Sequence, residues 1–88
     1  MRVVVSGRVQ GVGFRYSMLE RARSLGVGGW VRNRPDGTVE AVFEGQPDRV
    51  RSMVDWCHRG PRGALVEGVE QAAEQPQGER EFAHRPSG

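Results

Sequence analysis

The residues of this sequence best suited to chemistry lie close together near its start. Three glycines, Gly7, Gly11 and Gly13, are followed at once by Arg15. Glycines allow successive backbone N–H groups to turn inward and converge on one oxygen-rich ligand. An arginine close to such a loop can bind phosphate oxygens in bidentate fashion. The pattern indicates an anion site, although a tight strand-to-helix connection beside a solvated arginine explains the same four residues.

The spacing of these glycines does not match the two familiar nucleotide-binding loops. The dinucleotide fingerprint requires Gly-x-Gly-x-x-Gly, which the segment Gly7–Arg15 does not contain. The nucleotide P-loop ends in Gly-Lys-Ser or Gly-Lys-Thr, and the chain has no lysine. The sequence therefore does not predict a nucleotide site of either kind.

Three other reactive side chains, Cys57, His58 and His84, match no metal or nucleophile motif. A structural zinc site normally has four ligands, so no metal is expected. Cys57 is the only cysteine, which leaves it no partner for an intrachain disulfide and requires no oxidising compartment. We interpret Cys57 as a small core residue and His58 as a surface residue near a helix end.

The elements on either side of the glycine loop follow from hydrophobic periodicity. The β-branched residues of Arg2–Arg8 predict a strand. From Phe14 to Leu25 apolar residues recur at helical spacing, and Gly26 stands where a left-handed residue would end that helix. The loop is therefore expected to lead from a strand into a helix N-terminus, which is an arrangement that favours bound anions.

A β-hairpin is predicted next in the chain. Trp30–Asn33 and Thr38–Glu44 are rich in strand-forming residues, and the segment Pro35-Asp36-Gly37 between them is a strong turn signal. Trp30 and Phe43 are expected in the core rather than in a base-stacking platform.

The second half of the chain predicts one more helix and two more strands. A helix begins near Pro47, with an apolar stripe formed by Val50, Met53, Val54 and Cys57. Residues 64–69 form the fourth predicted strand. Residues 81–84 form an optional short last strand, which Pro86 confines to a sheet edge or ends early.

The order β-α-β-β-α-β is that of an α+β ferredoxin-like sandwich, in which two helices cover one face of an antiparallel sheet. A length of 88 residues predicts a single domain over 1–88, with 83–88 as a frayed tail. This fold by itself assigns no function, because it is shared by enzymes, regulatory modules and RNA binders.

Charge is unevenly distributed along the chain. All 13 basic residues are arginine; eleven of them face six acids in residues 1–63, and two face five acids in residues 64–88, giving net charges of +5 and −3. A basic front half suits an anionic ligand. No apolar run approaches the length of a membrane span, and we expect a cytoplasmic protein without a membrane partner.

Two longer segments make the interpretation specific. The segment Val5–Arg15 resembles the first signature of the acylphosphatases, and Gly29–Asn33, with Gly37-Thr38-Val39 and Gly45, resembles the second. The resemblance extends to about Glu70. It implies a monomeric, metal-free and cofactor-free enzyme that hydrolyses small acyl phosphates to carboxylate and inorganic phosphate.

The same resemblance implies roles for individual residues. Arg15 and Asn33 would be catalytic, with Arg15 binding the phosphoryl oxygens and Asn33 positioning the attacking water. The phosphate would also be bound by the backbone of Arg8, Val9, Gln10, Gly11, Val12 and Gly13. The family usually ends in a strand of the pattern Phe-x-Ile, and here His84 occupies the last apolar position.

Two other functions are weighed against this enzyme. Acylphosphatase-like domains also occur inside larger maturation proteins, so a module that binds phosphate or carbamoyl phosphate without hydrolysing it is one alternative. An RNA-binding ferredoxin-like domain is the other, because the isoelectric point is near 9.5. The chain lacks the aromatic-rich strand motif of such domains, and no nucleic acid partner is expected.

Overall fold

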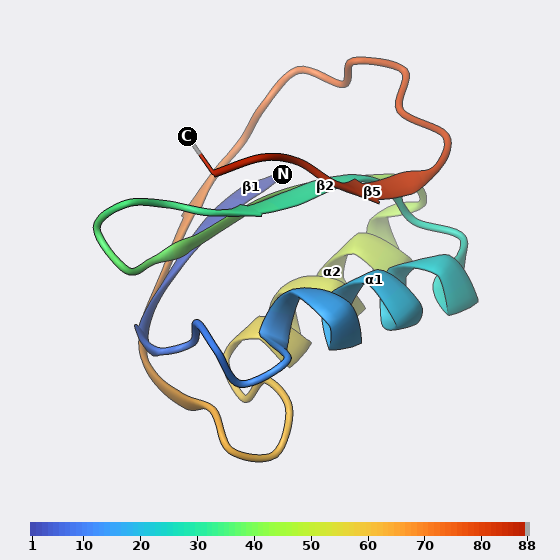
Figure 1. The fold of residues 1–88 in the computed structure, drawn as a ribbon. Helices are drawn as coiled ribbons and strands as arrows, with labels where there is room; N and C mark the ends of the chain where they lie inside the picture. Colours follow the sequence, from blue (N-terminus) through green and yellow to red (C-terminus); the bar gives the residue numbers. More distant parts are fainter. Residues whose placement is uncertain (88) are drawn as a thin grey trace.

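The computed structural model describes residues 1–87 and contains one sheet packed against two helices (Figure 1). Both helices cover the same face of the sheet, whose strand order is β4-β1-β3-β2-β5. The elements are β1 (Arg2–Arg8), α1 (Phe14–Leu25), β2 (Gly28–Asn33), β3 (Val39–Glu44), α2 (Pro47–Cys57), β4 (Leu65–Ala72) and β5 (Phe82–His84).

The ferredoxin-like sandwich predicted from the sequence is confirmed, with one correction to the sheet. The pairs β1–β3, β1–β4 and β2–β3 are antiparallel, whereas β5 runs parallel to β2. The sheet is therefore mixed and not purely antiparallel. The cause is the connection over 73–81, which carries the chain from the β4 edge to the β2 edge, so that β5 starts at the end where β2 starts.

The last strand is better formed than a frayed tail over 83–88 would allow. Ala83 and His84 belong to β5, and the Arg85 N–H donates to the Val31 carbonyl at 2.9 Å. Phe82 is fully buried and stacks on Phe43 with ring centroids 5.7 Å apart. This buried ring supplies the apolar contact that holds the short strand at the edge. Gly88, also part of the predicted tail, lies outside the described residues.

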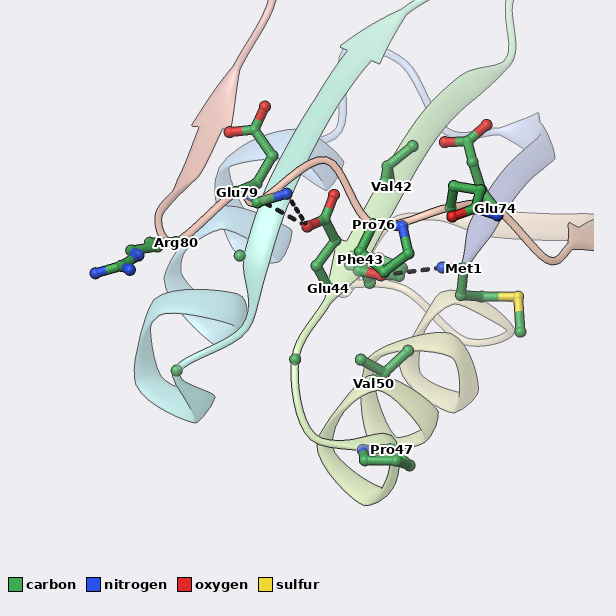
Figure 2. Close-up of a pocket in the computed structure, with 15 residues that line it drawn as sticks. Met1, Val42, Phe43, Glu44, Pro47, Val50, Glu74, Pro76, Glu79 and Arg80 are labelled. Carbon is green, nitrogen blue, oxygen red and sulfur yellow. Dashed lines mark hydrogen bonds between the residues drawn. The ribbon is translucent and has the colours of Figure 1, made fainter.

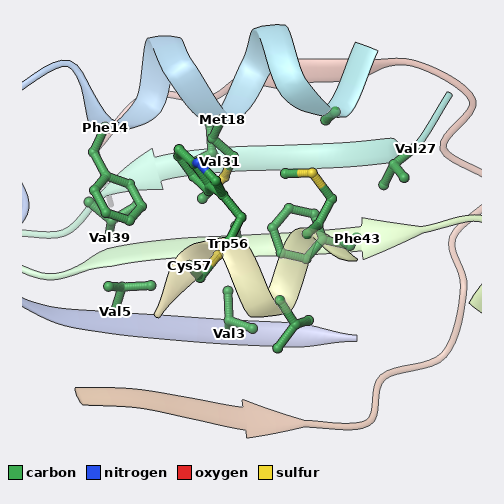
Figure 3. Close-up of a cluster of buried hydrophobic side chains, with 14 of the residues drawn as sticks. Val3, Val5, Phe14, Met18, Val27, Val31, Val39, Phe43, Trp56 and Cys57 are labelled. Atoms are coloured by element: carbon green, nitrogen blue, oxygen red, sulfur yellow. The ribbon is translucent and has the colours of Figure 1, made fainter. Parts of the chain in front are cut away.

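The core lies between the sheet and the helices (Figure 3). Phe14 packs against Trp56 with ring centroids 5.2 Å apart, which joins the start of α1 to the end of α2. Cys57 is buried as predicted, and burial raises the pKa of its thiol to about 12. The thiol therefore stays protonated at neutral pH and is no nucleophile. His58 follows α2 and is exposed, as expected.

Trp30 is not in the core, contrary to the sequence-based expectation. Successive side chains of a strand point to opposite faces. Val31 faces the helices and is fully buried, so Trp30 faces the open side of the sheet. There Arg32 and Arg85 lie over its ring at 5.3 and 4.7 Å from the centroid.

Candidate functional site

The glycine loop connects β1 to α1 and leaves the helix N-terminus open. Gly11 and Gly13 have φ of 75° and 78°, a left-handed conformation that favours glycine. No side chain caps α1, and its first turn contains no acidic residue. The first N–H groups of a helix have no partner within the helix, so here they can bind an anion.

Gln10 attaches this loop to the β2–β3 hairpin. Its side-chain Nε2 donates to the carbonyl oxygens of Arg34 and Thr38, both at 2.9 Å. The two bonds hold the loop beside the end of β2, where Asn33 is located. The side chain of Gln10 thus orders the loop, which leaves its backbone for ligand contact.

A cavity of about 150 Å³ lies where the loop, the first turn of α1 and the ends of β2 and β5 meet. Six of the residues singled out in the sequence line it: Val9, Gln10, Gly11, Gly13, Arg15 and Asn33. Arg8 and Val12 do not; Arg8 is exposed and Val12 packs partly against the core. Phe14, Tyr16 and His84 also line it, and no motif in the sequence pointed to a functional role for these three residues.

Asn33 brings an unusual polar atom to this cavity. Its amide oxygen, Oδ1, is buried and accepts no hydrogen bond from residues 1–87. A buried polar atom without a partner is uncommon in folded proteins and calls for an explanation. Asn33 is also among the residues that line the cavity, and no described residue competes with a ligand for its amide oxygen.

Arg15 supplies positive charge that the described residues do not neutralise. It is partly buried and forms no ion pair with the carboxylates of residues 1–87. No Asp or Glu is among the residues that line the cavity. The cavity therefore combines N–H donors, a free guanidinium group and an amide, which is a set that suits a phosphoryl group.

The arginines on either side of Asn33 in the sequence have carboxylate partners. Glu40 lies between Arg32 at 2.6 Å and Arg2 at 2.7 Å. Desolvation opposes ionisation of Glu40, but the two arginine hydrogen bonds outweigh it and hold the pKa of this carboxyl below its usual value. Arg34 lies 3.8 Å from Asp36. Arg15 differs from these three arginines because its guanidinium group has no carboxylate partner among residues 1–87.

A larger cavity, of about 660 Å³, lies at the opposite end of the sheet (Figure 2). The backbone segment 74–80, Met1, the end of β3 and the start of α2 enclose it. Two of its polar groups are paired. Glu44 accepts backbone N–H bonds from Gln77, Gly78 and Glu79 at 2.8–3.1 Å, and the Met1 ammonium donates to the Phe43 carbonyl at 3.1 Å. Arg80 and Glu74 also line this cavity without an ion pair to residues 1–87, but both are exposed. No buried side-chain polar atom of its lining residues lacks a partner.

Residues 1–87 contain neither a cluster of metal ligands nor a membrane-spanning helix. No three or more His, Cys, Asp or Glu side chains lie close enough together to hold a metal ion. None of the helices there has the length and apolar character needed to cross a membrane.

Comparison with known proteins gives a consistent result. A family model described as Acylphosphatase matches residues 1–84. An acylphosphatase of Trichormus variabilis is 58% identical over 82 residues, which cover 93% of this chain and 81% of the relative. The crystal structure of acylphosphatase from Bacillus subtilis superimposes with a TM-score of 0.89 at 35% identity, covering 96% of this chain and 94% of that one.

A longer protein contains a similar unit. The crystal structure of HypF from T. kodakarensis matches with a TM-score of 0.83 at 29% identity. The match covers 96% of this chain but only 11% of the HypF chain.

Proposed function

The chain belongs to the acylphosphatase family, and on that premise we propose that the cavity beside the glycine loop hydrolyses small acyl phosphates. Arg15 and the backbone N–H groups of loop 8–13 and the first turn of α1 hold the phosphoryl group, and Asn33 positions the attacking water. The observation that carries this proposal is the buried, unpartnered Oδ1 of Asn33 in the same cavity as the free Arg15.

Hydrolysis of an acyl phosphate needs few catalytic groups. The water oxygen bonds to phosphorus while the bond from phosphorus to the carboxylate oxygen breaks, giving a carboxylate and inorganic phosphate. The leaving carboxylic acid has a pKa of about 4, so its oxygen departs without a proton donor. What remains is to align the water with the departing oxygen and to balance charge on the phosphoryl oxygens.

Arg15 and the loop are suited to balancing the charge on the phosphoryl oxygens. Phosphoryl transfer leaves charge on the equatorial oxygens, which a guanidinium fork and fixed backbone N–H groups stabilise. The left-handed glycines and the uncapped start of α1 place such donors beside Arg15. Because no carboxylate lines the cavity, an anion there meets no like charge.

Asn33 is suited to aligning the attacking water with the departing oxygen. An amide oxygen accepts a hydrogen bond from a water molecule and thereby orients it, although an amide is a poor base. Burial of Oδ1 favours such a partner, since an unsatisfied buried acceptor costs on the order of 1–3 kcal/mol. Proximity and orientation of the water are then the main contribution of Asn33.

The ligands expected are a small acyl phosphate and, as product, inorganic phosphate. The small volume of the cavity, about 150 Å³, favours a small acyl group. We further propose a cytoplasmic monomer, for which the single buried cysteine requires no disulfide chemistry.

Non-catalytic binding is the main rival, since a domain of this fold forms about a tenth of the HypF chain. The RNA alternative is weakened by Trp30, because both guanidinium groups lie over the ring that a base would need for stacking. Hydrolysis of benzoyl phosphate by the full chain, measured with EDTA present, separates these possibilities.

Turnover that persists in EDTA is the expected result. Binding of inorganic phosphate without any turnover would support the binding module instead. A salt-sensitive shift of single-stranded RNA without turnover would support the RNA alternative. Loss of turnover on chelation, restored by added metal, would contradict the metal-free mechanism.

A further inference from the structure

The side chain of His84 has no part in the mechanism proposed above. His84 lines the cavity with Arg15 and Asn33. We infer that His84 is a further anion-binding residue of this cavity, whose imidazole adds a second positive charge beside Arg15 when it is protonated. This inference rests on the proposed phosphoryl site and deepens it.

The sheet register places His84 on the helix-facing side of β5. His84 pairs with Val31 of β2, which is fully buried under the helices. From this position the His84 Nε2 lies 3.3 Å from the Arg15 carbonyl oxygen in the first turn of α1. A carbonyl oxygen can only accept, so Nε2 carries the hydrogen of this bond.

The groups packed around His84 offer nothing to balance a positive imidazolium. The residues that line the cavity with His84 include Arg15 and Tyr16 from α1 and the neutral Asn33 from β2. No carboxylate lines the cavity. Directly after β5, Arg85 lies over Trp30 on the opposite face of the sheet, and Glu81 precedes the strand at its other end. An anion bound beside Arg15 is therefore the partner that would compensate the charge.

Anion binding and protonation of His84 then favour each other. Coupling between two ligands of one protein is reciprocal, and here the two ligands are an anion and a proton. A histidine can change its charge near neutral pH, so the affinity for a dianion should rise as the pH falls. Inorganic phosphate is a poor probe because its own charge changes in this range. Sulfate stays doubly charged and avoids that ambiguity.

The test measures sulfate affinity by calorimetry at about pH 5.5 and about pH 8. For the natural chain we expect binding about fivefold tighter at the lower pH, the modest gain of an exposed charge pair, since His84 is exposed. His84→Gln keeps an N–H donor for the Arg15 carbonyl but cannot gain a proton, so its sulfate affinity should be nearly independent of pH. His58→Gln removes the only other histidine, which is exposed after α2, and should keep the full pH dependence.

The outcomes distinguish this inference from the proposed site on which it rests. If His84→Gln keeps the pH dependence of the natural chain, or His58→Gln abolishes it, the role of His84 is wrong. If sulfate fails to bind at either pH, or binds Arg15→Ala as well as the natural chain, the phosphoryl site itself is wrong. A variant His84→Ala that loses affinity equally at both pH values would indicate only a structural contact with Arg15.

Discussion

The two ends of the sheet differ in whether their buried polar groups have hydrogen-bond partners. At the end with the larger cavity, three backbone N–H groups converge on Glu44 and the chain's ammonium group donates to Phe43. At the other end, Arg15 has no ion pair and Asn33 Oδ1 has no partner among residues 1–87. The volume of a cavity therefore does not identify the candidate ligand-binding site in this protein. Unsatisfied polar groups do, because a ligand completes them.

The largest effect should follow from removing the unpaired positive charge of Arg15, at the end of the sheet next to the glycine loop. For Arg15→Ala we expect kcat/KM for benzoyl phosphate to fall about 10³-fold, because transition-state charge loses its main counter-charge. Competitive inhibition by phosphate should weaken as well. Arg21→Ala removes an exposed arginine of the same helix and is the matched control. Equal losses in both variants would show a general effect of charge.

Asn33→Ala should separate catalysis from binding at the same end. We expect kcat to fall about 10²-fold through misplacement of the attacking water. The inhibition constant of phosphate should stay within about twofold, since Arg15 and the loop remain. Steady-state kinetics with phosphate as inhibitor measures both quantities. Normal kcat in this variant would contradict the water-positioning role.

Glu44→Ala tests the end of the sheet with the larger cavity. Removing the acceptor of three backbone N–H groups should lower the free energy of unfolding by about 2 kcal/mol, while kcat remains unchanged. Urea denaturation and the benzoyl phosphate assay provide the two readouts. Glu44→Gln keeps one acceptor oxygen and should lose less stability. A large fall in kcat with normal stability would mean that the two ends are coupled.

The smallest effects should come from a matched pair of glycines, one at each end. Gly13 and Gly78 have φ of 78° and 79°, and a Cβ at either would meet no atom within 4 Å. Each substitution by alanine should therefore destabilise the protein by about 1 kcal/mol through backbone strain alone. Only Gly13→Ala should also raise KM, by a few-fold, because it disturbs the N–H groups at the start of α1. Equal KM values for the two variants would argue against a role of this turn in binding.

Much of the fold could be predicted because its signals are local. The apolar spacing of Phe14–Leu25 and the left-handed Gly26 define α1 within the chain segment itself, and the helix has those bounds. The direction of β5 could not be predicted in this way, since it depends on which edge of the sheet the connection over 73–81 reaches. The face taken by Trp30 has the same cause, because Trp30 and Val31 are both apolar and only the register decides which is buried.

By itself, the sequence determined the family, the order of the elements and the residues proposed for the site, because these depend on residue types at close spacing. Which of these residues come into contact depends on how the chain folds. The tertiary structure brings Asn33 and Arg15 to one cavity, leaves Arg8 outside it and adds His84 from the last strand. The physical reason is that residues far apart in the chain become neighbours only through strand register and helix packing. Whether a polar group finds a partner depends on those neighbours.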